Sequence, residues 1–361
     1  MKLVSNQRYR YTPRRRQPLK RGAFPIVITV PAALGIAVIA FWLLSSGGGA
    51  PARGRGQQEQ DPVLAVLSAS CAPRQQCGAT PAPTPTPRRA AATPQEATPV
   101  EDADPPQISG SAAVVMEEPC AALLHELNPG LRMPPASLTK IATALVAEEN
   151  SELDELVSIE VSGPEFSLQT DSTVMGLEPG QTLDMRDLLY GLLLPSGNDA
   201  AIQIAEHVGG SVKRFVQMMN AKAAELGLED THFANPHGLD DPALYSSAYD
   251  MAVLGRELLR RPALAEMVRS RIYQPSWDGP AVANLNQLLS FYPGTLGVKT
   301  GYTDQAGQTI VAAVEQNGRR IIVTILGDQF DIYRDVSELL NWAFQSTEPA
   351  CETGGLSRAF P

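Results

Sequence analysis

The segment PPASLTK, residues 134–140, begins an apolar, alanine-rich run that continues to Glu149. Its two prolines can open a helix, because their fixed φ suits a first turn, where a missing N–H group costs nothing. Apolar residues such as Ile141 and Leu145 then recur at helical spacing, and this pattern predicts a helix. Ser137 and Lys140 are three residues apart and therefore share one face of that helix.

A hydroxyl and an amine held together near a helix N-terminus can form an activated nucleophile. The positive end of the helix dipole and the loss of water around the amine both favour its neutral, proton-accepting form. A Ser-x-x-Lys spacing, however, occurs by chance about once in a chain of this length. Assigning a catalytic role to Ser137 and Lys140 therefore requires evidence from other parts of the chain.

Two further polar motifs follow in order, Ser196–Gly197–Asn198 and Lys299–Thr300–Gly301. The first would be an ordinary turn before a helix if it stood alone. A Lys-Thr-Gly tripeptide is expected by chance in only about one such chain in ten, and here it ends an apolar, strand-like run. The three motifs in this order are typical of penicillin-binding proteins and serine β-lactamases.

The sequence around these motifs resembles the low-molecular-mass D-alanyl-D-alanine carboxypeptidases from about Ser111 to Phe344. The matching segments are RMPPASLTKIATALV, PSGNDAAIQIAEHVGG, FVQMMNAKAAELGLEDTHFANPHGLDD, SSAYDMAVLGRELL and GVKTGYTDQAG. The resemblance implies an α/β (α+β) fold of the β-lactamase/DD-peptidase type, with helices flanking an antiparallel sheet and a helical subdomain beside it. Many members add a β-rich C-terminal domain, which we do not expect in the 17 residues after Phe344.

The resemblance also implies a serine acyl-transfer mechanism on a peptidoglycan stem peptide, with β-lactam antibiotics as covalent inhibitors. Ser137 would attack the carbonyl of the penultimate D-alanine, and Lys140 would take the serine proton. Ser196 would relay that proton to the leaving amine, and Asn198 would hold Lys140 and the substrate backbone. The backbone N–H groups of Ser137 and Tyr302 would form the oxyanion hole.

The Lys-Thr-Gly motif is predicted to bind the substrate from an edge strand beside the groove. Lys299 would add positive potential that keeps Lys140 neutral and attracts a carboxylate. Thr300 would bond that carboxylate, and Gly301 would leave room for the substrate against the strand. Arg334 matches an arginine of the family that binds the terminal carboxylate of the substrate.

The hydrophobic pattern predicts a sheet assembled from both ends of this region. Two apolar runs, 112–116 and 121–127, indicate a hairpin, and Asn317–Gly318 joins two later strands in a tight turn. Ser211 and Gly227 are expected to cap a helix, and Ser247 with Asp250 resembles a capping box. The other predicted elements are strands over 156–161, 296–300, 309–315 and 320–326, and helices over 183–194, 212–226, 251–259 and 331–344.

The N-terminal part of the chain is organised differently. Residues 1–23 carry eight Lys or Arg and no acid, and the 21 residues Phe24–Leu44 carry no charge. This length spans a bilayer, and the basic residues place the N-terminus in the cytoplasm and the catalytic domain outside the cell membrane; a signal peptide cleaved near residues 47–50 is the alternative. The predicted parts are a basic tail 1–23, a transmembrane signal anchor 24–44, a Pro/Ala/Thr-rich disordered linker 45–107, a catalytic domain 108–346 and a C-terminal tail 347–361.

Charge and cysteine content exclude some classes of protein and suggest a compartment. The residues after position 23 carry 21 Lys or Arg against 39 Asp or Glu, a balance that argues against nucleic acid as a partner. The four histidines and four cysteines show none of the HExxH, HxH or CxxC spacings of metal sites, so we expect no metal and no cofactor. Exported thiols tend to be oxidised, which predicts disulfides Cys120–Cys351 and Cys71–Cys77.

Three alternative functions stay open on the sequence. A serine β-lactamase of the most familiar class would need a glutamate to activate water, and neither Glu165 nor Glu178 lies in a matching motif. A DD-endopeptidase would cut cross-links with the same residues. A non-catalytic cell-wall-binding or penicillin-sensing module is disfavoured, because every catalytic residue type is present.

Overall fold

The computed structural model describes residues 104–276 and 279–351. The chain divides into two units, 1–83 and 84–361, and all described residues belong to the second. The predicted membrane anchor, nearly all of the predicted linker and the Cys71–Cys77 pair lie outside the described residues. Within them, every helix is too short or too polar to cross a membrane.

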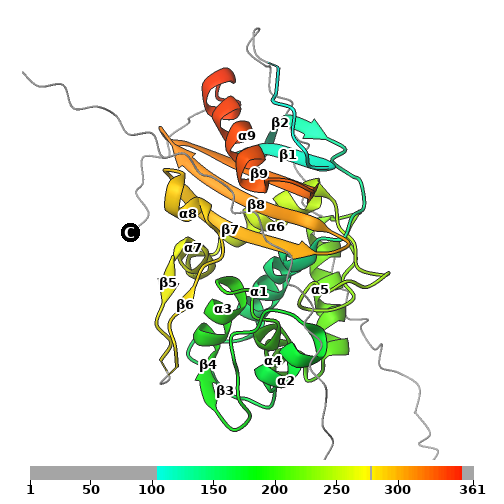
Figure 1. Cartoon of the computed structure of the whole chain (residues 1–361), viewed down its shortest axis with the longest axis vertical. Helices are drawn as coiled ribbons and strands as arrows, with labels where there is room; N and C mark the ends of the chain where they lie inside the picture. The colour runs from blue at the N-terminus through cyan, green and yellow to red at the C-terminus, as the bar shows by residue number, and fades with distance from the viewer. Residues whose placement is uncertain (1–103, 277–278, 352–361) are drawn as a thin grey trace, which may run out of the picture. The chain divides into compact units, whose positions relative to one another are not determined.

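A five-stranded antiparallel sheet, in the order β2-β1-β9-β8-β7, forms the centre of the described part (Figure 1). The first two strands come from its start and the other three from its end, so the predicted assembly from both ends is confirmed. Asn317 and Gly318 have φ of 53° and 78°, as a two-residue hairpin turn requires. The strands are β1 (Ala112–Glu118), β2 (Ala122–Leu127), β7 (Thr295–Thr303), β8 (Gly307–Gln316) and β9 (Arg319–Asp328).

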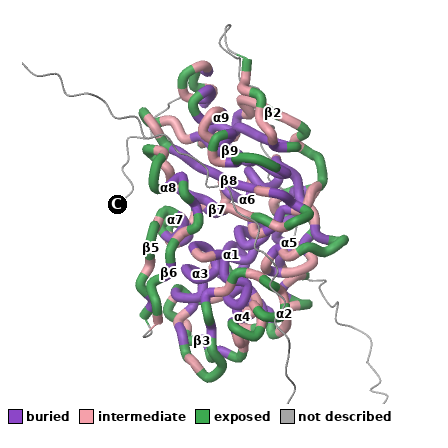
Figure 2. Tube along the Cα trace, in the orientation of Figure 1, coloured by how far each residue is buried: buried purple, intermediate pink, exposed green. Residues whose placement is uncertain are grey.

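Both faces of this sheet are buried, because its central strands alternate between two hydrophobic cores (Figure 2). In β1, Val114 and Met116 join one core and Val115 joins the other, as the period of two in a strand dictates. The C-terminal helix α9 (Ile332–Ser346) covers the second core with residues such as Leu339 and Leu340. The larger helical part of the molecule packs on the first core.

Helix α1, which carries the buried continuation of the PPASLTK segment, packs against several other helices on the first core. Ser211 and Ser247 accept bonds from backbone N–H groups three residues on, and Gly227 has a φ of 72°, so all three predicted helix ends are confirmed. The helices are α1 (Thr139–Asn150), α2 (Gly163–Thr170), α3 (Met185–Leu193), α4 (Asn198–Gly209), α5 (Val212–Leu226), α6 (Ala248–Leu259), α7 (Pro262–Arg269) and α8 (Leu288–Phe291).

Several element boundaries differ from the prediction. The predicted strand 156–161 is only β3 (Leu156–Ser158), which pairs with β4 (Thr182–Asp184) in a small separate sheet. The predicted helix over 251–259 begins three residues earlier, because Ser247 itself is the cap. A two-stranded ribbon of β5 (Ile272–Tyr273) and β6 (Val282–Ala283) was not predicted. Tertiary packing determines where such short elements begin and end, and local sequence patterns do not predict that packing.

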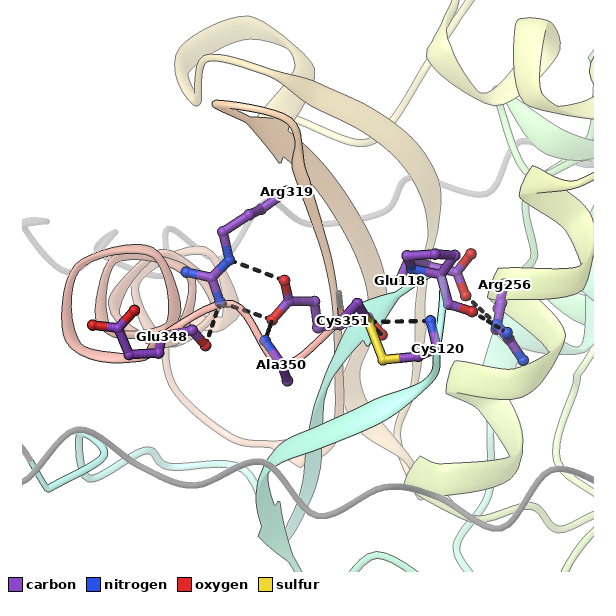
Figure 3. The surroundings of a disulfide bond; sticks show 9 residues. Glu118, Cys120, Arg256, Arg319, Glu348, Ala350 and Cys351 are labelled. Carbon is purple, nitrogen blue, oxygen red and sulfur yellow. Dashed lines mark hydrogen bonds and ion pairs between the residues drawn. A yellow bond between two sulfur atoms is a disulfide. The ribbon is translucent and has the colours of Figure 1, made fainter. Parts of the chain in front are cut away.

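The C-terminal segment is fastened to the turn between β1 and β2 by a disulfide between Cys120 and Cys351 (Figure 3). This confirms the predicted pairing of two cysteines that are 231 positions apart. Beside it, Arg319 Nη2 donates to Glu117 Oε2 at 2.8 Å and Arg319 Nη1 to Thr347 O at 3.0 Å. Residues 347–351, predicted as tail, are therefore tied to the sheet.

We expect Cys351→Ser to lower the free energy of unfolding by about 2–5 kcal/mol, because the disulfide closes a long loop in the unfolded chain. Neither cysteine lines the catalytic pocket described below, so acylation of the folded variant should be unchanged. Denaturant unfolding of Cys120→Ser, Cys351→Ser and the double variant measures the effect. A double variant that loses much more than either single variant would contradict a shared bond.

Candidate active site

Ser137 lies in a 3₁₀ turn, η1 (Ala136–Leu138), that runs directly into α1. The structure differs here only in detail from the predicted continuous helix, and the two side chains do share one face. Lys140 is fully buried, and its Nζ lies 3.0 Å from Ser137 Oγ. Ala136, the residue before the serine, has a φ of 49°, a conformation that costs free energy and is often found at functional sites.

Lys140 Nζ has two other acceptors, Asn198 Oδ1 at 2.6 Å and the carbonyl oxygen of His237 at 2.6 Å. Neither can donate a hydrogen bond. The two N–H groups of a neutral amine are therefore used by these acceptors, and its lone pair is left for the hydroxyl of Ser137. The geometry suits a lysine that receives the serine proton.

The electrostatic surroundings also favour a neutral Lys140. Burial lowers the pKa of Lys140 well below its ordinary value, the positive charge of Lys299 lowers it further, and the charge of Asp199 raises it. Burial also lowers the pKa of Lys299 to about 7. The pKa of His237 is lowered to about 3 by burial and by the charge of Lys140, so its imidazole is neutral at physiological pH and adds no positive charge.

The Ser-Gly-Asn motif lies where α4 begins. Asn198 is the first residue of α4, and its side chain bridges Lys140 and Ser172, to which Nδ2 donates at 2.9 Å. Ser196 precedes it with a φ of 65° and is 5% exposed. The Ser196 hydroxyl has no hydrogen-bond partner, yet the residue lines the pocket. A buried hydroxyl without a partner is costly and suits a group that bonds only once substrate is present.

The Lys-Thr-Gly motif lies on β7, which is the edge strand of the sheet as predicted. Lys299 is 2% exposed, and its Nζ donates to Thr300 O at 2.8 Å. A Cβ atom at Gly301 would lie 2.8 Å from Ser137 N and 2.6 Å from Thr309 Oγ1. The strand thus passes so close to the serine backbone that only glycine fits there.

These residues surround a cavity of about 710 Å³. Ser137, Ser196, Asn198, Thr300, Gly301 and Tyr302 all line it, and Lys140 and Lys299 are buried behind it. Ser172 and Thr173, from the segment after α2, also line it, and the sequence did not predict their presence there. Tertiary contacts such as that of Ser172 with Asn198 place these residues there, and no local pattern in the sequence signals them.

The structure does not bring Arg334 to this cavity. Its side chain is 65% exposed at the start of α9, and its Nε donates to Glu338 Oε1 at 2.9 Å. Ile332 and Tyr333, two residues and one residue earlier, line the cavity instead. The predicted carboxylate-binding role of Arg334 stays a prediction, and it would require the side chain to leave Glu338.

The Lys299→Met variant should shift the acid limb of the pH profile for acylation by penicillin to higher pH. Removing the positive charge of Lys299 raises the pKa of Lys140, and acylation needs the neutral amine. The profiles should differ most below pH about 7, where Lys299 carries its charge. Lys222→Met is the control, since Lys222 is a buried lysine that pairs with Glu149 and Glu225. An unshifted limb in Lys299→Met would contradict this coupling.

Comparison with known proteins agrees with this geometry. The sequence profile of the D-alanyl-D-alanine carboxypeptidase family matches residues 99–330. D-alanyl-D-alanine carboxypeptidase DacF of Bacillus subtilis is 35% identical, over 66% of this chain and 62% of the relative. DacB2 of Mycobacterium tuberculosis, named for the same activity, is 36% identical over 62% of this chain and 78% of the relative.

Solved structures show the same fold. The Streptomyces K15 DD-transpeptidase has a TM-score of 0.65 and 29% identity, covering 67% of this chain and 99% of that one. Penicillin binding protein 5 from Haemophilus influenzae has a TM-score of 0.63 and 34% identity, covering 67% and 73%. The predicted DD-peptidase fold is thus confirmed.

The described part of the chain has the fold of the penicillin-binding DD-peptidases, with the three motifs assembled around one cavity. The chain belongs to the D-alanyl-D-alanine carboxypeptidase family. It spans 62% of the length of the Bacillus subtilis relative and 64% of the length of D-alanyl-D-alanine carboxypeptidase DacA of Haemophilus influenzae.

Proposed function

We propose that this protein is a serine D-Ala-D-Ala carboxypeptidase that removes the terminal D-alanine from peptidoglycan stem pentapeptides. The observation that carries the proposal is the contact of buried Lys140 Nζ with Ser137 Oγ, 3.0 Å apart beside a cavity lined by both other motifs. Membership of the family supports the choice of substrate.

Acylation would use the groups in the order in which they surround the cavity. Ser137 Oγ attacks the carbonyl carbon of the penultimate D-alanine while its proton passes to Lys140 Nζ. The negative charge on the substrate oxygen is held by the N–H groups of Ser137 and Tyr302. The C–N bond then breaks, and the leaving amine takes a proton through the unpartnered hydroxyl of Ser196.

Hydrolysis of the acyl-enzyme would repeat these steps with water. Lys140 takes a proton from the water that attacks the ester, and Ser137 Oγ regains a proton as the C–O bond breaks. The penicilloyl ester should persist, because its leaving group stays tethered in the pocket. The residues that line the cavity include no glutamate to activate water against it.

Recognition of the free terminal carboxylate is assigned to β7. Thr300 lines the cavity beside Lys299, whose positive charge attracts an anion. Charge-assisted hydrogen bonds of this kind are among the strong ones in proteins. Arg334 joins this site only if it exchanges Glu338 for the substrate, and Arg334→Ala should then harm carboxylate-ended peptides more than substrates without that group.

Two assays on one preparation of the full chain test the proposal. We expect D-alanine release from diacetyl-Lys-D-Ala-D-Ala and little turnover of a chromogenic cephalosporin. Rapid cephalosporin turnover without D-alanine release would favour a β-lactamase. Cleavage confined to cross-linked dimers would favour an endopeptidase. Penicillin labelling with neither activity would favour a non-catalytic penicillin-binding module.

We further propose that the protein is anchored in the cell membrane by one helix, with the catalytic domain outside the cytoplasm. The support is the uncharged stretch Phe24–Leu44, the basic residues before it and a disulfide in the catalytic domain. The full chain should stay in the membrane fraction after alkaline extraction, and a chain without residues 1–44 should not. Release of the full chain by this treatment would contradict the anchor.

A further inference from the structure

Asp199, the residue after the Ser-Gly-Asn motif, is a fully buried carboxylate that the mechanism above does not use. It is the second residue of α4, where the helix dipole favours a negative charge. Within residues 104–276 and 279–351 no lysine, arginine or histidine forms an ion pair with it. A buried charge of this kind needs hydrogen bonds in place of a cation.

Backbone N–H groups supply those hydrogen bonds. Asp199 Oδ1 accepts from Met175 N at 2.8 Å and from Ala200 N at 2.9 Å. Asp199 Oδ2 accepts from Gly176 N and Leu177 N, both at 2.9 Å. Three consecutive residues of the segment that follows α2 are therefore bound to a single side chain.

The space around the carboxylate is shaped to receive it. A Cβ atom at Gly197 would lie 2.9 Å from Asp199 Oδ1 and 3.0 Å from Met175 N, closer than side chains normally pack. Gly163 likewise faces Asp199 Oδ2 with no room for a side chain. The segment and α4 meet closely because both positions are glycine.

The segment that Asp199 holds contributes to the wall of the cavity. Ser172 and Thr173 line the cavity and are separated from the three anchored residues only by Val174. Asn198 donates from its backbone N to Thr173 O at 2.9 Å and from Nδ2 to Ser172 Oγ at 2.9 Å. A shift of this segment would therefore move the same Asn198 side chain that binds Lys140.

The charge of Asp199 acts on the catalytic lysine as well. It raises the pKa of Lys140, whereas the charge of Lys299 lowers it. The two charged groups lie on different elements, α4 and β7. Asp199 and Lys299 thus shift the pKa of Lys140 in opposite directions from two different elements.

We propose that Asp199 is a positioning residue that fixes the segment Ser172–Leu177 as a wall of the catalytic cavity and opposes the charge of Lys299 at Lys140. The inference rests on the proposed acyl-transfer function. It assigns Asp199 no contact with substrate. Its effect reaches the reaction through Asn198, Ser172 and Lys140.

Acylation of the full chain by labelled penicillin, measured against pH in three variants, tests the proposal. Asp199→Ala should lower the second-order rate constant at least tenfold. Asp199→Asn removes the charge at nearly constant size and should move the acid limb to lower pH, because the pKa of Lys140 falls. Its Nδ2 cannot accept from Gly176 N and Leu177 N, so this variant also loses part of the anchoring.

Gln203→Ala is the matched control. Gln203 is also buried on α4 and also holds a loop, accepting from Glu160 N at 2.8 Å and Val161 N at 3.2 Å. It is uncharged, however, and the loop that it holds does not line the cavity. This variant should acylate within twofold of the wild type, with an unshifted limb.

Equal losses in Asp199→Ala and Gln203→Ala, or an unshifted limb in Asp199→Asn, would overturn the proposal. If the Asp199 variants do not fold, amide hydrogen exchange of the wild type tests whether Asp199 anchors the segment. The amides of Met175, Gly176 and Leu177 should exchange as slowly as those inside α4, and exchange at the rate of a free loop would overturn the anchoring. A wild type that penicillin does not acylate would refute the proposed function instead, and the exchange measurement would still test the anchor.

Discussion

Ser137→Ala is expected to lose both covalent labelling by penicillin and release of D-alanine, the latter by a factor of at least about 10⁴. Ser137 Oγ is the hydroxyl that lies 3.0 Å from Lys140 Nζ. Alanine has no hydroxyl group that the amine could deprotonate. Labelling and D-alanine release should be measured on the same preparations of wild type and variant.

A neighbouring hydroxyl supplies the control for this experiment. Thr139 is fully buried two residues along, and its Oγ1 has no hydrogen-bond partner. Thr139→Ala should therefore keep both activities, apart from any loss of stability. Labelling that survived in Ser137→Ala would mean that another residue is the nucleophile.

Gly301→Ala should reduce kcat/KM for D-alanine release by about 10²–10³, the loss typical of a damaged oxyanion hole. The added methyl group would lie 2.8 Å from Ser137 N, 2.6 Å from Thr309 Oγ1 and 3.1 Å from Ala136 Cβ. To relieve these contacts, β7 must move away from η1. That movement separates the N–H groups of Ser137 and Tyr302, which are predicted to bind the oxyanion together.

Gly130→Ala is the matched control, because a Cβ atom there would meet only the end of the Asp230 side chain, at 3.1 Å. Steady-state kinetics should show near-normal activity for this variant. Wild-type kcat/KM in Gly301→Ala would refute the role given to the close approach of β7 to Ser137.

The parts of the site that the sequence predicts are those carried by short motifs. Ser137 and Lys140 are three residues apart on one helical turn, so their proximity follows from helix geometry. The edge position of Lys299 follows from the strand pattern, and the sheet was predicted to form from both ends of the domain. The Cys120–Cys351 bond could be predicted because Cys120 lies in the first hairpin and Cys351 just after the terminal helix, which packs on the same sheet.

The other parts of the site depend on loops. The carbonyl oxygen of His237 accepts from Lys140, and any residue type could supply a carbonyl group there. Ser172 and Thr173 reach the cavity because Asp199 binds the segment after them, which is a tertiary contact without local periodicity. The role of Arg334, which rests on its matching position in the sequence, stays a prediction, since its side chain pairs with Glu338 and does not line the cavity.

The most direct measurement is the position of the covalent adduct. The full chain is incubated with benzylpenicillin, quenched in acid, digested and mapped by mass spectrometry. The account predicts one penicilloyl group per chain, located on Ser137 within residues 134–140. An adduct on Ser196 or another residue, or D-alanine release by a protein that forms no adduct, would contradict it.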